Sequence, residues 1–89
     1  MLEVTNLTSN KGNKIPNQIS IETDKEILFK SYNSIIVKID KETNKTYLCN
    51  IFWNYSKTTS KYRNIFLGED KKTTEQKIKN GIYLLTDLN

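Results

Sequence analysis

The residues best suited to binding chemistry lie in one stretch of this sequence, between positions 53 and 63. Its candidate binding residues are Trp53, Tyr55, Lys57, Lys61 and Arg63. Aromatic rings can stack on nucleobases, and two lysines spaced one helical turn apart can face the same phosphate backbone. The first amides of a helix that starts here could also receive a phosphate. The pattern therefore predicts a surface for nucleic acid or for a protein partner.

A simpler interpretation assigns the aromatic residues of this stretch to the core. Trp53, Tyr55 and Tyr62 would then pack against a β-sheet, Ser56 would cap a helix, and the lysines would form an ordinary solvated face. A chain of 89 residues has a small core, and that core needs its only tryptophan. We therefore favour core packing for the aromatic side of the stretch and solvent contact for its lysine side.

Tyr32 is the other candidate binding residue, because it lies among three small polar residues, Ser31, Asn33 and Ser34. Where a strand bends, these side chains could form a polar binding face. The alternative is ordinary turn chemistry with a tyrosine on the sheet surface, and we favour this alternative.

Catalytic and metal sites are not expected in this chain. It has no histidine and a single cysteine, so neither a zinc site nor a histidine-dependent catalytic triad can be assembled. Its carboxylates lie largely in lysine-rich segments such as 40–42 and 69–72, which are typical of solvated turns. Cys49 is expected to be a small apolar core residue on a strand. We expect a protein that is not an enzyme and that uses no metal or cofactor.

The composition predicts one soluble domain over residues 1–89. The chain is 36% hydrophobic and 27% charged, with a net charge of +4 that favours acidic partners only mildly. No apolar run reaches the roughly 18 residues of a membrane span, and the N-terminus lacks a signal-peptide pattern, so we expect a cytoplasmic protein that does not bind membranes. Residues 1–14 predict a marginal strand followed by a loosely ordered loop.

Alternating apolar residues predict strands in the first half of the chain. Three isoleucines between residues 15 and 21 alternate with polar residues, and residues 23–25 suit a hairpin turn. Segment 26–40 is apolar and β-branched but is interrupted at residues 31–34. It is either one long bent strand or two strands.

A β-hairpin is predicted around Asn44. Within residues 35–39, simple alternation places Ile36 on the opposite face from Val37. Asn44 suits the left-handed conformation that closes a hairpin, and residues 46–51 supply the returning strand.

The apolar spacing changes to that of a helix after residue 56. Ser56 can cap this helix, Gly68 can end it, and the expected range is about 57–67. Its apolar stripe consists of Tyr62, Ile65 and Phe66.

A second, shorter helix is predicted over about residues 74–79. Thr73 would cap it, with Gln76 three residues later, and Asn80 with the next glycine would end it. Residues 82–85 are a final strand. These elements predict an α+β fold with a small antiparallel sheet of three to five strands and two short helices packed on one face.

Five segments share a distinctive pattern, and together they cover nearly the whole chain. They are 11–18, 31–36, 53–63, 66–69 and 84–89. The most specific combination is the Ser-Tyr-Asn strand with the later run Trp-x-Tyr-Ser-x-Thr-Thr-x-Lys-Tyr. In these segments the chain resembles a family of small uncharacterised proteins from phages and prophages of Gram-positive bacteria. The resemblance implies a non-structural accessory protein that acts in the host cytoplasm.

The small size, the missing catalytic residues and this resemblance favour a protein-binding modulator of a host system. An anti-CRISPR or another anti-defence inhibitor is the concrete case, and its partner would be a host protein such as a defence complex. The alternative is a small basic accessory protein that binds nucleic acid through Lys57, Lys61 and Arg63. An enzyme would require converging carboxylates in a concave site, for which the sequence gives no sign.

Overall fold

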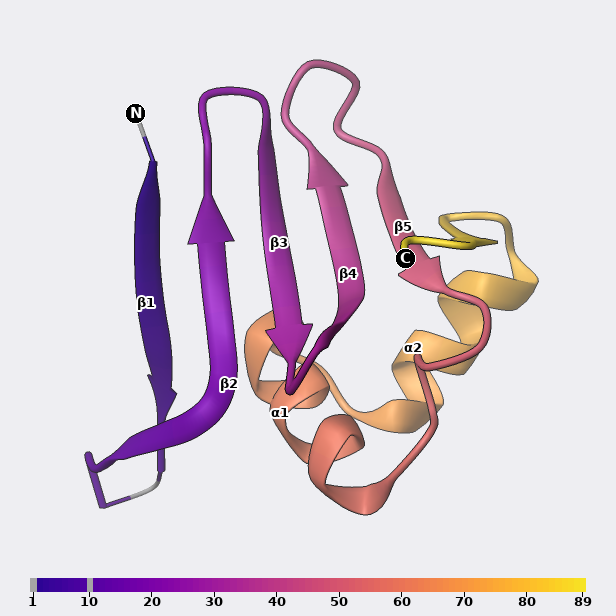
Figure 1. The fold of residues 1–89 in the computed structure, drawn as a ribbon. Coiled ribbons are helices and arrows are strands. Elements are labelled where there is room, and N and C mark those ends of the chain that lie inside the picture. The colour runs from indigo at the N-terminus through magenta and orange to yellow at the C-terminus, as the bar shows by residue number, and fades with distance from the viewer. Residues whose placement is uncertain (1, 10) are drawn as a thin grey trace.

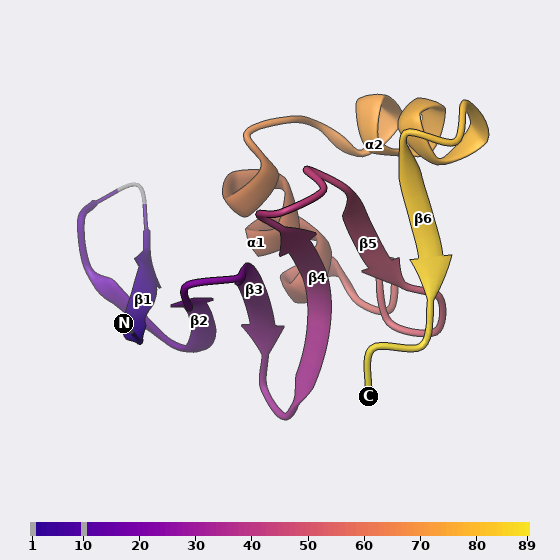
Figure 2. The same cartoon turned by 90° about the horizontal axis from the view of Figure 1, so that it is seen from above.

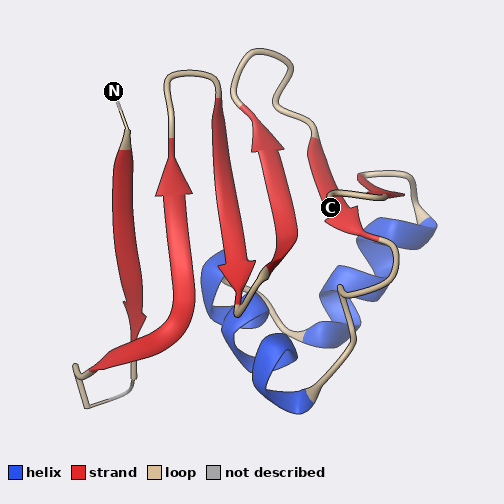
Figure 3. Cartoon of the chain, viewed as in Figure 1, coloured by secondary structure: helices blue, strands red, loops and turns tan. Residues whose placement is uncertain are grey.

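The computed structural model describes residues 2–9 and 11–89, which form six strands and two helices. In chain order they are β1 (Glu3–Thr8), β2 (Lys14–Glu22), β3 (Glu26–Ser31), β4 (Ser34–Asp40), β5 (Thr46–Cys49), α1 (Lys57–Leu67), α2 (Lys71–Lys79) and β6 (Tyr83–Thr86). The α+β class is confirmed (Figures 1 and 3). Residues 1 and 10, part of the segment expected to be loosely ordered, lie outside the described residues.

The strands form a single sheet in the order in which they occur in the chain. Neighbours from β1 to β5 are antiparallel, whereas β5 and β6 are parallel. The predicted all-antiparallel sheet of three to five strands is therefore wrong in both strand number and direction. The parallel pair arises because the chain passes through both helices between β5 and β6, which is the long crossover that parallel strands require. Both helices lie on the same side of the sheet (Figure 2).

Segment 26–40 forms two strands, and a bulge between them changes which residues are buried. The register shifts after Phe29, so that Ile36 and Val37 are both almost fully buried, at 1% and 0% exposure. The simple alternation expected here is wrong at Ile36, because a bulge adds one residue to one strand and turns its neighbours. The turn itself contains Tyr32 with a positive φ of 55°.

The hairpin between β4 and β5 is as predicted, with Asn44 in the left-handed region at φ 59°. The returning strand ends at Cys49, before the expected residue 51. The chain then turns, with the Trp53 amide donating to the Cys49 carbonyl at 2.9 Å. Cys49 is fully buried, as expected for a core cysteine.

Helix α1 has the predicted bounds and both predicted ends. The Ser56 side chain accepts a hydrogen bond from the Thr59 amide at 3.1 Å, and Gly68 ends the helix with φ 70°. Of the predicted apolar stripe, Tyr62 is buried, while Ile65 is 43% exposed and does not join the core. Phe66 stacks on Phe29 of β3, with ring centroids 5.4 Å apart.

Helix α2 begins earlier than predicted. Its cap is Asp70, whose carboxylate accepts from the Thr73 amide at 2.8 Å, and not Thr73 itself. A carboxylate is the stronger acceptor at a helix N-terminus and also complements the helix dipole. The helix ends at Asn80 as predicted.

The core lies between the helices and the sheet. Its buried hydrophobic residues are Phe29, Ile36, Val37, Leu48, Tyr62 and Tyr83, with Trp53, Phe52 and Phe66 among the partly buried residues packed against them. No helix among the described residues is long and apolar enough to cross a membrane.

Candidate functional site

Two groups of residues that the sequence singled out separately meet in one cleft. The cleft has a volume of about 270 Å³ and lies between the β3–β4 turn and the chain entering α1. We call it the tyrosine cleft, and its lining residues are Ser31, Tyr32, Asn33, Ser34, Ile36, Phe52, Tyr55, Ser56 and Thr59. None of these lining residues carries a charge at neutral pH. The cleft therefore offers hydroxyl, amide and aromatic surface to a ligand.

Tyr32 reaches the cleft from the tip of the β3–β4 hairpin. Its amide donates to the carbonyl of Asn17 at 2.7 Å, and both residues have positive φ values, 55° and 68°. The left-handed region is unfavourable for a bulky residue such as tyrosine and persists only where the surroundings hold it. The side chain remains 54% exposed, so the constrained backbone presents an accessible ring.

Tyr55 lines the cleft from the other side. It is 71% exposed, and its ring meets Phe52 edge to face with centroids 5.5 Å apart. The expectation that Tyr55 packs against the sheet is wrong. A turn in which the Tyr55 amide donates to the Phe52 carbonyl at 3.2 Å lets Phe52 and Trp53 pack on the core while Tyr55 faces solvent.

Two of the buried residues that line the cleft are polar. The hydroxyl groups of Ser31 and Thr59 lie 3.0 Å apart in a buried hydrogen bond that joins β3 to α1. Gln18 pairs with Ser31 across the strands, and its side chain is 1% exposed with no hydrogen-bond partner among the described residues. Buried amides without partners are rare, so Gln18 leaves hydrogen-bonding capacity one strand away from the cleft.

Arg63 does not lie on the binding surface at all. It is fully buried, and its guanidinium donates to the Trp53 carbonyl and, at 2.8 Å, to the side-chain oxygen of Asn64. Its central carbon lies 5.3 Å from the centre of the Trp53 ring. Burial lowers the pKa of Arg63, while the charges of Glu69 and Glu75 oppose this effect. Arg63 thus fastens the segment before α1 to the helix.

The lysines of the candidate stretch are divided between two environments. Lys61 is exposed, and its ammonium lies 5.4 Å from the ring centre of Tyr62 on its own helix. Lys57 lines a second hollow of about 390 Å³. We call this the basic hollow, and its lining residues are Asn54, Tyr55, Ser56, Lys57, Ser60 and Lys71.

The basic hollow and the tyrosine cleft share Tyr55 and Ser56 as a common wall. An uncharged cleft and a hollow with two lysines therefore lie on either side of one exposed tyrosine. Lys71 was not predicted as a site residue. Only the fold brings the start of α2 to the start of α1, and no local sequence signal marks this proximity.

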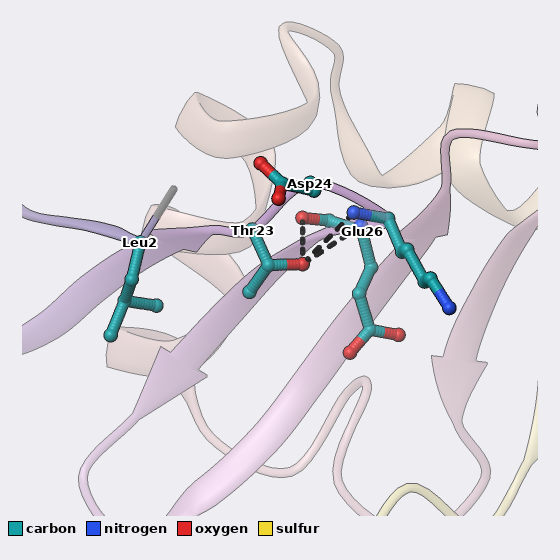
Figure 4. A pocket seen from close by; sticks show the side chains of 5 residues that line it. Leu2, Thr23, Asp24 and Glu26 are labelled. Carbon is teal, nitrogen blue, oxygen red and sulfur yellow. Dashed lines mark hydrogen bonds between the residues drawn. The ribbon is translucent and has the colours of Figure 1, made fainter.

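A larger hollow of about 510 Å³ lies at the β2–β3 turn (Figure 4). Its lining residues are Leu2, Thr23, Asp24, Lys25 and Glu26. The Thr23 hydroxyl accepts from the amides of Lys25 and Glu26 at 3.2 and 3.0 Å and donates to the Glu26 carbonyl at 3.3 Å. The Thr23 hydroxyl thus stabilises the turn, which gives this residue a structural role. We place the candidate site at the tyrosine cleft.

A sequence model of a family of unknown function, DUF8033, matches residues 2–81. The chain belongs to this family. No curated protein and no solved structure matches the chain. The DUF8033 match contains every residue of the tyrosine cleft and of the basic hollow, whereas β6 follows it. Within the described residues of this DUF8033 protein, no group of three or more His, Cys, Asp or Glu side chains could hold a metal ion.

Proposed function

We propose that this protein is a phage-encoded, non-enzymatic modulator of a host system that binds a host protein at the tyrosine cleft. The observation that supports this proposal is the pair of exposed tyrosines, Tyr32 and Tyr55, on either side of an uncharged cleft. Tyrosine is enriched in the centres of protein interfaces because its ring supplies large contact area and its hydroxyl a hydrogen bond.

The cleft suits a side chain or turn of a partner protein. Its lining combines small polar groups such as Asn33 and Ser34, which can form hydrogen bonds, with the apolar side chains of Ile36 and Phe52. Apolar and hydrogen-bonding groups in one cleft, flanked by aromatic side chains, suit an interface hot spot. The lining residues include no carboxylate, and this composition favours recognition over acid–base chemistry.

The phage origin and the cytoplasmic site of action rest on the resemblance of the five sequence segments. The specific modulator that we propose is an anti-defence inhibitor such as an anti-CRISPR. Because the chain carries a net charge of +4, we propose contact with a protein subunit of the host system, and not imitation of duplex DNA.

The experiment is an affinity pulldown from host lysate with and without nuclease, coupled to a phage plaque assay in a defence-positive host. We expect capture of a host protein that persists after nuclease treatment. We also expect the phage to be protected from the host defence. Tyr55→Ala and Tyr32→Ala should each weaken binding by about tenfold or more, as hot-spot truncations do. Ile82→Ala is the matched control, because Ile82 is an exposed apolar residue that lines neither hollow.

A capture that the tyrosine variants leave unchanged would refute the cleft as the docking site. Absence of both capture and phage protection would refute the modulator.

The basic hollow favours a second function, binding of single-stranded nucleic acid. A base could stack on Tyr55 while Lys57 and Lys71 contact phosphates on the far side of the ring. The nuclease arm of the pulldown separates the two functions. Capture that nuclease abolishes, and that weakens steeply with salt, would support nucleic acid as the ligand.

A further inference from the structure

We propose that the helix-free face of the sheet is an interaction surface for a second copy of this chain. This inference is independent of the tyrosine cleft. We define the open face by the outward residues of β1 to β6, because cross-strand partners point to the same side of a sheet. Phe29, which stacks on Phe66 of α1, fixes the opposite, helix-covered side.

One row of side chains crosses the whole open face in register. Its members, from β1 to β6 of the described sheet, are Val4, Ile21, Leu28, Lys38, Tyr47 and Leu84. A second row adds Ile19 and Ile35 on either side of Lys30. Rows in which one lysine interrupts otherwise apolar residues are unusual on the uncovered side of an antiparallel sheet, because such a face normally alternates with the core face and carries mainly polar residues.

The two faces of the sheet differ in burial, and β3 shows the difference within one strand, with Phe29 at 0% exposure and Leu28 half-buried. On the helix side, Phe29, Val37 and Leu48 are 0% exposed. On the open face Ile21 and Leu28 remain half-buried, and the row ends in Val4 at 58% exposure. Among the described elements no helix covers this face, and the C-terminal segment reaches only one corner, beside Ile35 (Figure 2). Contiguous apolar surface of this kind marks an interaction site.

The charges along β3 and β4 identify a second copy as the occupant. On the open face, Glu26 pairs in register with Asp40 at one end of the strands, and Lys30 lies toward the other end. The Lys38 ammonium lies 3.7 Å from the Glu26 carboxylate in the same chain, a long and partly exposed ion pair that leaves Glu26 accessible on the open face. Lys30 has no ion pair within the described residues. These four residues sum to zero charge, so two copies can bring their open faces together although each chain carries +4.

Leu28 lies midway between Glu26 and Lys30 on β3. A two-fold axis across the strands at Leu28 would place Glu26 of one copy opposite Lys30 of the other, twice in each dimer. This isologous contact is self-complementary, as a two-fold dimer requires. It corresponds to two sheets packed face to face. The molecule measures 35 × 31 × 21 Å, so one broad face can supply the roughly 800 Å² per partner of a standard interface.

A charge exchange tests the arrangement with the full chain. Sedimentation equilibrium should show a concentration-dependent dimer for the wild type. Lys30→Glu and Glu26→Lys should each weaken self-association by about tenfold or more, because each places like charges opposite one another. An equimolar mixture of the two variants should form a heterodimer of near wild-type affinity, because every opposed pair is then of opposite charge. Lys45→Glu makes the same charge change at an exposed loop residue and should dimerise normally.

Circular dichroism of each variant verifies its fold before the association is measured. A wild-type chain that stays monomeric up to about 1 mM would overturn the proposal. A dimer whose affinity neither variant changes would also overturn it. So would a mixture that associates no better than either variant alone. Binding of the monomer to lipid vesicles through Leu28 would assign the face to a different occupant.

Discussion

At the scale of single residues, two residues of the candidate stretch have the opposite burial from the one expected. Arg63 was expected on the surface and is buried, whereas Tyr55 was expected in the core and is exposed. Both outcomes depend on the turn after β5, which directs the Trp53 carbonyl toward α1 and leaves Tyr55 outside. A buried guanidinium bonded to a backbone carbonyl stabilises that turn, because its loss would leave the carbonyl without a partner.

Arg63→Ala should therefore destabilise the protein by about 3 kcal/mol, through an unpaired carbonyl and a cavity beneath Trp53. Urea denaturation followed by tryptophan fluorescence measures the change. Lys61→Ala is the matched control on the same helix, and because its side chain is exposed it should shift stability by less than about 0.5 kcal/mol. If Arg63→Ala changed stability as little as Lys61→Ala, Arg63 would have no structural role.

The candidate binding residues could be found in the sequence, but the sequence did not show that they lie together. Tyr32 and Tyr55 were each recognisable from an unusual local composition. Their meeting in one cleft depends on the Ser31–Thr59 hydrogen bond between β3 and α1, a contact between residues 28 positions apart. No local pattern encodes such a contact.

At the scale of elements, local signals were reliable where the physics is local. The ends of α1 were predicted from Ser56 and Gly68, because capping depends on residues within one turn. The start of α2 was missed because Asp70 and Thr73 are both acceptable caps, and the side chain of Asp70 makes the bond. The parallel direction of β6 was missed although both helices of the crossover were predicted, because the sequence does not show that β5 and β6 are neighbours in the sheet.

A partly buried network then links α2 to β6. The Glu69 carboxylate accepts hydrogen bonds from Lys77 at 2.7 Å, Thr74 at 2.7 Å and Tyr83 at 2.9 Å. Burial alone would raise the pKa of Glu69, but these hydrogen bonds outweigh it and hold the pKa below its ordinary value. A carboxyl group with a lowered pKa in the folded state stabilises the fold above its unfolded pKa of about 4.3 and loses that contribution as pH falls.

Glu69→Gln should consequently lower stability by about 1–3 kcal/mol at pH 7 and by much less at pH 3. Urea denaturation of both proteins at the two pH values gives the comparison. Glu75→Gln removes only an exposed carboxylate, whose oxygen lies 3.8 Å from the Lys71 nitrogen, and should have little effect at either pH. A stability difference for Glu69→Gln that is the same at both pH values would exclude the charge as its cause.

At the scale of the whole molecule, the end of the described chain closes the sheet where β5 stops short. The Asn89 side chain accepts from the Ile35 amide at 2.8 Å and donates to the Ile35 carbonyl at 3.0 Å. It thereby replaces the strand partner that Ile35 would otherwise lack. Its amide also donates to the Cys49 sulfur at 3.4 Å. One side chain thus links the C-terminal segment, β4 and β5.

Asn89→Ala should destabilise the protein by about 0.5–1.5 kcal/mol, because it removes two hydrogen bonds to the Ile35 backbone, whose groups lie where water can replace them. It should also speed the labelling of Cys49 by a thiol reagent, because local opening near β5 then becomes easier. Asn50→Ala is the matched control: Asn50 is exposed, and its only hydrogen bond among the described residues is made by its backbone, to Thr86. If Asn89→Ala changed neither the urea midpoint nor the labelling rate relative to Asn50→Ala, the C-terminal segment would lie on the sheet without stabilising it.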